Sequence, residues 1–328
     1  MKRLATFISG GKSLEQTLDR VRLAEQLGYE AVFDTHIAAR DGLMLLAAYA
    51  NATTRIKVGT GVLPAFPRHP VSLAGEAATL DEISSERLIL GIGPSHRITM
   101  ENWYGLPMEK PLTQMKEYVA ILRDIFTKGA ATFSGEFYRG SYAFMGYKAR
   151  TDIPIYVSAL APNMLRWAGA AADGVILWGC LPSYIERVVT PTVRAGAEEA
   201  GRDPASVEIV AAIPTALTSN AAAGYDALRG DFFTYMMLPF YRRAIEGAGY
   251  GDEIKAFDEA NGRGDMAAAK AAMSERMMSE FGAIGDEATI DKKYQQYRDA
   301  GVSLPAVGLF QAGDGFAGIE ATLEAAIR

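Results

Sequence analysis

His36 is the residue of this sequence best suited to proton chemistry. It follows the apolar run at residues 31–33 and Asp34, a pattern typical of a buried strand. An imidazole has an unperturbed pKa of about 6.5, so it can take or give a proton near neutral pH. A histidine at the carboxyl end of a barrel strand can reach a bound substrate. His36 is therefore the candidate catalytic residue, and a structural histidine hydrogen-bonded to the backbone is the alternative interpretation.

Small and polar residues are combined at the end of another buried strand, residues 88–93. Gly93 allows the backbone to approach a flat ring closely. Ser95, His96 and Arg97 follow it and should project from the same rim. A lone GxG is weak evidence for a nucleotide, and no GxGxxG opens a helix in the Rossmann manner.

Residues 153–177 are typical of a strand, a helix that begins at Pro162, and a second strand. The small residues Ser158, Ala159 and Ala161 precede the helix and leave backbone N–H groups within reach of a ligand. The amino-terminal end of a helix carries partial positive charge, which suits an anion. Taken alone, the segment is one right-handed crossover, for which ordinary packing is the alternative explanation.

Strand and helix patterns alternate along the whole chain. Eight strands are predicted, at residues 4–9, 31–34, 56–63, 88–93, 154–159, 175–178, 207–217 and 306–310. The first helix has Ser13 as its cap, Leu14 and Leu18 in its apolar stripe, and Gly28 at its end. Eight strand–helix units predict an α/β fold of the (β/α)8 TIM-barrel class in one domain, residues 1–328. A doubly wound open sheet is the competing architecture.

Two segments interrupt the alternation. Residues 128–150 predict a short hairpin, which we expect to cover one end of the barrel. Residues of about 220–285 form a mostly helical insertion after the seventh strand, which is a candidate lid or dimer element. The alternative interpretation is that the aromatic and methionine residues of the insertion are ordinary helix core; these are Phe232, Phe233, Met236, Met237 and Phe240. The same alternative applies to Trp103, Tyr104 and Trp178 elsewhere in the chain.

Composition narrows the class of protein. The 328 residues are 49% hydrophobic and carry a formal net charge of -6, which argues against a nucleic-acid surface. Cys180 is the only cysteine, so no disulfide or cysteine-rich metal site is expected, and no metal is predicted. No apolar stretch of about 20 residues is present, so we expect a soluble cytoplasmic protein that does not contact membranes. His69 and Arg68 are interpreted as structural.

Several separated segments carry a family resemblance: IKVGTGVLPAFPRHPVSLAGEAATLDEIS, RLILGIGPS, IPIYVSALAPNMLRWAGAAADGVIL, GAEEAGRDPASVEI and IGDEATIDKKYQQYRDAGV. In this order and spacing the chain resembles the luciferase-like flavin and deazaflavin oxidoreductases. Within them it is most similar to the coenzyme F420-dependent branch that includes methylenetetrahydromethanopterin reductase. The resemblance implies a TIM barrel that holds the cofactor ring at the carboxyl ends of its strands and catalyses hydride transfer.

The resemblance also implies site residues. The Gly61–Val62 peptide should be cis and form a bulge behind the cofactor ring. His36 aligns with a histidine of the family, but Thr35 replaces the acid that usually precedes it. The implied cofactor-binding residues are Asp34, Gly61, Val62, Gly93, Ser95, Ser158, Ala159, Leu160, Ala161, Asn163, Met164, Trp178 and Gly179.

Two mechanisms fit this resemblance. In the first, coenzyme F420 exchanges a hydride with a small-molecule substrate while His36 or solvent handles the proton. In the second, FMN is the cofactor and the enzyme is a monooxygenase; a non-catalytic flavin-binding relative is a third possibility. No motif distinguishes a pterin, a sugar, a quinone or a xenobiotic as substrate. We expect the protein to form a homodimer.

Overall fold

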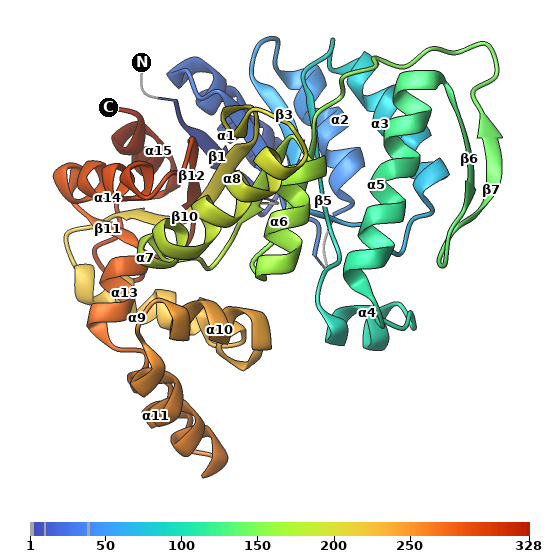
Figure 1. Ribbon diagram of the computed structural model, residues 1–328. Helices are drawn as coiled ribbons and strands as arrows, with labels where there is room; N and C mark the ends of the chain where they lie inside the picture. Colours follow the sequence, from blue (N-terminus) through green and yellow to red (C-terminus); the bar gives the residue numbers. More distant parts are fainter. Residues whose placement is uncertain (1–2, 10, 38–39) are drawn as a thin grey trace.

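The computed structural model describes residues 3–9, 11–37 and 40–328 and has a closed parallel barrel at its centre (Figure 1). Its eight strands are β1 (Ala5–Phe7), β2 (Ala31–Asp34), β3 (Lys57–Thr60), β5 (Leu88–Gly93), β8 (Ile155–Ser158), β9 (Gly174–Leu177), β10 (Glu208–Leu217) and β12 (Leu304–Leu309). Each strand pairs with the next, and β1 pairs with β12, so the sheet has no open edge. This closure confirms the predicted TIM barrel and excludes the doubly wound alternative.

Two short strands extend the sheet at the carboxyl ends of the barrel strands. β4 (Leu63–Pro64) lies beside the end of β5, and β11 (Ala283–Gly285) lies beside the end of β10. Ile92 of β5 and Thr215 of β10 each pair with a short strand on one side and with a barrel strand on the other. The mouth of the barrel is therefore deeper at these two places.

Helices surround the barrel as predicted (Figure 1). They are α1 (Leu14–Leu27), α2 (Gly42–Ala52), α3 (Pro70–Ile83), α5 (Pro111–Lys128), α6 (Pro162–Ala171), α8 (Thr190–Glu199), α14 (Glu287–Asp299) and α15 (Ile319–Ile327), with the short α4 (Arg97–Trp103), α7 (Pro182–Tyr184), η1 (Ile185–Val189) and η2 (Pro204–Ser206) in the connections. α1 shows why these boundaries arise. Ser13 accepts a hydrogen bond from the N–H of Gln16, and Gly28 ends the helix in the left-handed conformation with φ 88°. Leu14, placed in the apolar stripe by its spacing, is 44% exposed, so that part of the prediction was wrong.

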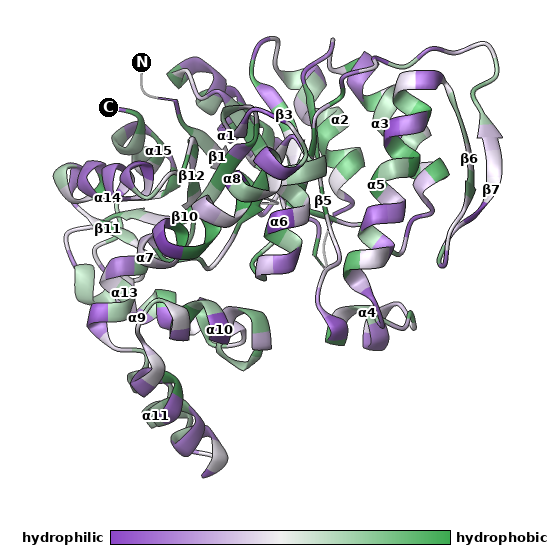
Figure 2. Cartoon of the chain, viewed as in Figure 1, coloured by the Kyte–Doolittle hydropathy of each residue, from purple (hydrophilic) through white to green (hydrophobic). Residues whose placement is uncertain are grey.

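The apolar core follows the barrel (Figure 2). Inside it, Ala5, Phe33, Ile89, Tyr156 and Leu304 form one buried cluster. A larger cluster joins the outer strand faces to the helices. The interior of the barrel and the layer between its strands and helices are therefore packed as two separate clusters.

The hairpin β6 (Ala130–Ser134) and β7 (Arg139–Ala143) is antiparallel, as predicted. It packs against the outer side of α5 and does not cover a barrel end, so this expectation was wrong (Figure 1). The Glu117 carboxylate on α5 accepts hydrogen bonds from the N–H groups of Glu136, Phe137 and Tyr138 in the hairpin turn. This anchor holds the hairpin to the helix layer.

The insertion consists of α9 (Ala221–Phe232), η3 (Tyr235–Met237), α10 (Pro239–Gly247), α11 (Gly251–Gly262), α12 (Met266–Ala272) and α13 (Glu275–Phe281). It has an apolar core of its own, in which Phe232 and Met236 are buried as the core interpretation predicts. The same interpretation was wrong for Met237 and Phe240, which are 56% and 47% exposed. Leu160, Trp178 and Phe310, which follow barrel strands, pack against this core. The insertion therefore lies over the carboxyl ends of β8, β9 and β12.

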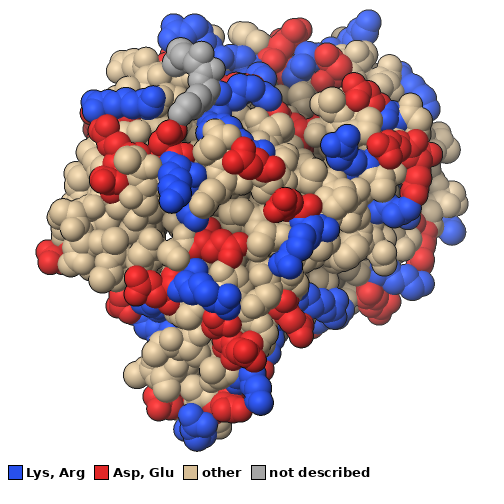
Figure 3. Space-filling view, turned by 60° about the vertical axis from the view of Figure 1, so that its left-hand side comes forward, with Lys and Arg blue, Asp and Glu red and all other residues tan. Residues whose placement is uncertain are grey.

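The surface carries acidic and basic side chains interspersed with one another on the face shown in Figure 3. Among the described residues, no helix is both long enough and apolar enough to span a bilayer. The homodimer and the cytoplasmic location stay predictions.

Candidate active site at the mouth of the barrel

Small residues and aromatic rings meet at the carboxyl ends of β1, β2 and β3. The Phe7 and Phe33 rings stack with their centroids 5.3 Å apart. A Cβ atom added at Gly61 would lie 2.4 Å from the Phe7 ring, so only glycine fits at this position. The Gly61–Val62 peptide is cis, as predicted. The turn after β3 is therefore held directly against the two rings.

Gly93 and Ser158 lie side by side at the ends of β5 and β8. A Cβ atom at Gly93 would be 2.1 Å from Ser158 Oγ and 3.0 Å from Val62 Cγ2. Residues that are far apart in the sequence are thus brought together at one edge of the barrel. We call Gly61, Val62, Gly93 and Ser158 the glycine cradle, because side chains are missing or small where these strands end.

His36 is held by the amino-terminal end of α2. Its Nδ1 accepts a hydrogen bond of 2.9 Å from the N–H of Gly42, the first residue of that helix. Asp41 caps α2, places Oδ2 3.8 Å from His36 Nδ1, and forms an ion pair with Arg68. Burial and the nearby Arg68 guanidinium lower the pKa of His36, which Asp41 only partly opposes. The imidazole is therefore neutral at physiological pH.

Asp34, two residues before His36, is 2% exposed. Its Oδ2 forms no hydrogen bond with the described residues, and burial raises the pKa of Asp34 to about 6. A Cβ atom at Gly42 would lie 3.1 Å from this oxygen, so the carboxyl group faces the start of α2. Phe33, its neighbour in the strand, points into the barrel instead. The Asp34 carboxyl therefore lies outside the barrel interior, at the start of α2, the helix end that holds His36.

α6 begins at Pro162, shortly after Ser158 at the end of β8. Ala161 is its N-cap and provides no side-chain hydrogen bond, and Pro162 lacks an N–H group. The N–H groups of Asn163 and Met164 consequently have no capping side chain, which leaves them to bind an acceptor. Ala159 is buried, and the carbonyl of Leu160 accepts a hydrogen bond of 3.1 Å from the Tyr184 hydroxyl, which fixes the loop.

An aromatic cluster covers the other side of the mouth. The Trp178 ring lies 5.9 Å from Tyr235, and Tyr235 lies 4.9 Å from Tyr241. The His96 and Tyr241 rings lie 5.8 Å apart between centroids, and burial lowers the pKa of His96. The buried Nε1 of Trp178 has no hydrogen-bond partner among the described residues. Gly179 adopts φ 62°, and a Cβ atom there would be 2.7 Å from the Tyr241 ring.

The remaining rim residues lie where the strand pattern placed them. Ser95 has φ 63°, an uncommon conformation for a residue other than glycine. It turns the chain from β5 into α4, where Arg97 is exposed and pairs with Glu101. His69 caps α3 by accepting a hydrogen bond from the N–H of Val71, which confirms its structural role. Trp103 and Tyr104 are 57% and 38% exposed and belong to none of the apolar clusters of the described residues, so the core interpretation was wrong for both.

Sequence reasoning did not find Asp41, Arg68 and Gly42 around His36, or Tyr235 and Tyr241 around Trp178. Asp41 directly precedes an apolar helix and is of a residue type that often caps helices. That pattern could have located the start of α2 near His36. The aromatic contacts join segments far apart in the sequence and carry no local pattern.

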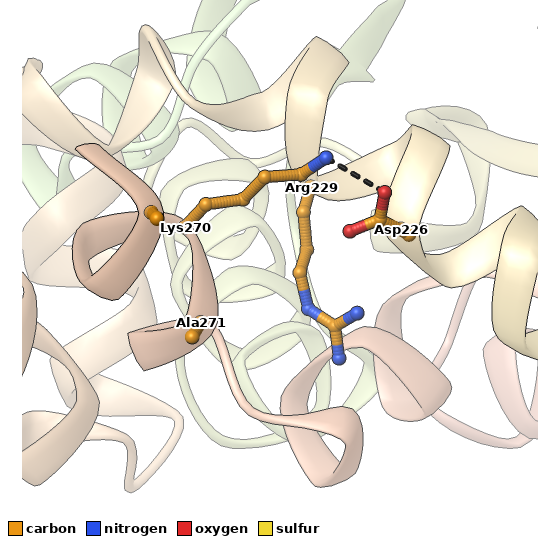
Figure 4. A pocket seen from close by; sticks show the side chains of 5 residues that line it. Asp226, Arg229, Lys270 and Ala271 are labelled. Atoms are coloured by element: carbon orange, nitrogen blue, oxygen red, sulfur yellow. Dashed lines mark hydrogen bonds and ion pairs between the residues drawn. The ribbon is translucent and has the colours of Figure 1, made fainter.

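A surface cavity of about 410 Å³ lies away from these groups, between α9 and α12 of the insertion (Figure 4). Its lining includes Asp226 and Lys270, which form an ion pair of 2.8 Å, and Arg229. No barrel-strand residue lines this cavity, so it is separate from the mouth of the barrel. Among the described residues, no group of three histidine, cysteine or acidic side chains is arranged to hold a metal ion.

Comparison with known proteins agrees with this geometry. Residues 2–304 match the family model described as luciferase-like monooxygenase. The 5,10-methylenetetrahydromethanopterin reductase of Methanolobus tindarius is 32% identical over 290 residues, which are 88% of each chain. The structure of the coenzyme F420-dependent tetrahydromethanopterin reductase from Methanopyrus kandleri superposes with a TM-score of 0.84 at 26% identity, covering 99% of this chain and 98% of the other.

A more distant structure shares the fold alone. The oxygenating constituent of 3,6-diketocamphane monooxygenase from Pseudomonas putida, in complex with FMN, has a TM-score of 0.70 at 17% identity and covers 99% of this chain and 96% of the other. The family model spans almost the whole chain, and the barrel mouth has the cis peptide that the resemblance implied. The chain therefore belongs to the luciferase-like monooxygenase family.

Proposed function

We propose that this protein is an oxidoreductase that uses coenzyme F420 and exchanges a hydride between the deazaflavin ring and a small organic substrate. The observation that carries the proposal is the glycine cradle next to the uncapped start of α6. A flat ring needs an approach free of side chains, and an anionic tail needs N–H donors. Gly61 and Gly93 carry no side chain of their own, although Phe7 and Ser158 fill the directions in which one would point. The uncapped start of α6 follows β8, the strand that pairs with β5.

The residues present fit such a cofactor. Gly61, Val62 and Gly93 would lie against the ring, and the N–H groups of Asn163 and Met164 would bind a phosphodiester. When bound, the deazaflavin supplies or accepts the hydride. The unpaired Nε1–H of Trp178 offers one further donor at the mouth. The aromatic cluster of the insertion would exclude water from the reacting carbon.

FMN remains the alternative because it also combines a flat ring with a phosphate. The reductase relatives favour the deazaflavin, since one of the solved structures is named as dependent on coenzyme F420. The FMN-bound neighbour has only 17% sequence identity to this chain and supports the fold alone.

Equilibrium titration of the purified protein with coenzyme F420 and with FMN, followed by absorbance, tests the proposal. We expect tighter binding of the deazaflavin. Gly93→Ala should weaken that binding about tenfold, because a methyl group would overlap Ser158 Oγ and force the side chains of the glycine cradle to move. Gly75→Ala on α3 is the matched control, since a Cβ atom there meets nothing within 4 Å. Affinity for FMN about ten times that for the deazaflavin would favour the monooxygenase alternative.

Hydride transfer is tested separately. The reduced deazaflavin should be oxidised by the protein in the presence of an electron-poor carbonyl or imine compound, under anaerobic conditions. A small panel of ketones, aldehydes and pterin imines would identify the substrate class. Binding of the deazaflavin without turnover of any member, in either direction, would favour the non-catalytic relative.

A further inference from the structure

The hydrogen bond between Gly42 and His36 determines where the imidazole carries its proton. A backbone N–H group can only donate, so the Nδ1 atom that receives the bond at 2.9 Å must be unprotonated. A neutral imidazole with a bare Nδ1 has its hydrogen on Nε2. The fold therefore selects one of the two tautomers of His36.

The surroundings oppose the doubly protonated form. Gly42 begins α2, whose partial positive charge disfavours an imidazolium at this end. Arg68 forms an ion pair with Asp41 and lies 3.6 Å from Glu76, so the nearest carboxylate is already neutralised. Asp34, on β2, is buried beside the same helix start, and its Oδ2 forms no hydrogen bond with His36 or with any other described residue.

Nε2, the second ring nitrogen, takes no part in this network. None of the described residues forms a hydrogen bond with it, and the side chain is 12% exposed. The group that is open to a ligand is thus an N–H donor. It sits at the carboxyl end of β2, next to Thr35, whose hydroxyl donates to the carbonyl of Gly61 in the glycine cradle.

We propose that His36 acts as a fixed, neutral hydrogen-bond donor that holds an acceptor atom of the substrate through Nε2–H, and does not exchange a proton during turnover. This inference rests on the proposed function. In a carbonyl reduction, the hydride from the reduced deazaflavin forms the new C–H bond, and the C=O π electrons move to the oxygen. Water supplies the proton to that oxygen as the product is released into solvent, and bulk solvent neutralises the hydroxide left behind, while His36 keeps its own proton.

The acid–base alternative requires a rearrangement. To act as a base, Nε2 would first have to lose its hydrogen to Nδ1, which would break the bond with Gly42 and place two N–H groups face to face. To act as an acid, the ring would need a second proton on Nδ1, which would also point at the N–H group of Gly42. A preorganised donor avoids both costs and stabilises charge that develops on the substrate oxygen.

Conservative substitutions separate the two roles. The amide of His36→Gln can place an N–H donor near the position of Nε2, whereas the shorter amide of His36→Asn reaches only as far as Nδ1. We expect His36→Gln to keep kcat within about tenfold of the parent protein, and His36→Asn and His36→Ala to lose about a hundredfold or more. His69→Gln, at the helix cap, is the matched control and should leave kcat unchanged. Equal, large losses in all three His36 variants would overturn the proposal.

Nitrogen NMR of protein labelled with ¹⁵N-histidine gives a readout that does not need the cofactor. The resonances of His36, identified by their absence in His36→Gln, should show a bare Nδ1 and a protonated Nε2 between about pH 7 and 8. A protonated Nδ1 in this range would overturn the tautomer assignment. Because this measurement succeeds or fails without deazaflavin, its outcome is distinguishable from failure of the proposed function.

Discussion

At the amino-terminal end of the barrel, the Glu208 carboxylate accepts a hydrogen bond of 2.9 Å from the buried Tyr156 hydroxyl and pairs with Arg3 at 2.7 Å. Arg3 also pairs with Glu30. At the carboxyl end, Asp34 Oδ2 and Trp178 Nε1 are buried without partners among the described residues. The carboxyl end also contains the Arg68–Asp41 ion pair, but it differs from the amino-terminal network in having these two buried polar atoms without a partner.

The difference shows how a single barrel separates stability from ligand binding. Unpaired buried polar atoms cost free energy, so a fold tolerates them where a ligand will satisfy them. The distinction is not absolute, since Arg298 Nη1 is unpaired although its Nη2 donates to the carbonyl of Arg3. Substitutions at the two ends should therefore affect different observables.

The largest effect is expected at the mouth. His36→Ala should lower kcat/KM about 10²–10³-fold, because a positioned donor is removed from the developing charge on the substrate. Cofactor affinity and the free energy of unfolding should change little by comparison. Steady-state kinetics and urea denaturation check this. A variant with normal kcat/KM would remove His36 from the reaction.

At the opposite end, Glu208→Ala should lower the free energy of unfolding by about 2–3 kcal/mol, since the buried Tyr156 hydroxyl would lose its acceptor. Glu208→Gln keeps an acceptor and should cost less. Denaturant titration measures both variants. Turnover by the folded protein should be unchanged, and a large loss of turnover at full stability would contradict the separation of the two ends.

A smaller effect of opposite sign is expected for Asp34→Asn. The pKa of Asp34 is raised from 3.8 to about 6, so the folded protein holds this proton more tightly than the unfolded chain. Its contribution to stability is present below about pH 4 and is lost as the pH rises through about 6. Asn does not ionise, so the variant does not lose stability as the pH rises, and its free energy of unfolding at pH 7 should exceed that of the parent by about 1–3 kcal/mol. Parallel unfolding curves at about pH 4 and pH 7 test this, and equal differences at the two pH values would argue against it.

The smallest effect concerns the indole at the mouth. Trp178→Phe removes an N–H donor and keeps most of the ring contact with Tyr235. We expect affinity for the deazaflavin or the substrate to fall about three- to tenfold, the range for one neutral hydrogen bond. The kcat should remain close to that of the parent. Unchanged affinity for both ligands would mean that Nε1 is simply an uncompensated group of the fold.

The sequence predicted the features that depend on local patterns. The eight strands, the cap at Ser13 and the helix start at Pro162 follow from spacing and from single residue types. The position of Gly93 at the mouth follows because strand ends share one edge of a barrel. The cis peptide at Gly61 came from the family resemblance and not from any local pattern.

Features set by distant contacts were not predicted. The ion pair of Arg68 with Asp41 joins residues 27 positions apart, and it decides the charge around His36. Met237 and Phe240 share the apolar character of buried helix residues, and only the packing of the insertion decides that they face outward. The hairpin lies on α5 because Glu117 binds its turn, which no strand pattern reveals.

Because β11 pairs with β10, the first and last residues of the insertion lie close together at the barrel. Thr215 is opposite Ala283 and Leu217 is opposite Gly285, and the N–H of Thr218 donates to the carbonyl of Gly285 at 3.0 Å. Neighbouring strands are about 4.8 Å apart, so the two ends of this long segment are separated by little more than one peptide unit. A segment of quite different length could be joined there without moving a barrel strand. The barrel can thus acquire a new cover, and with it a new range of substrates, through exchange of one contiguous module.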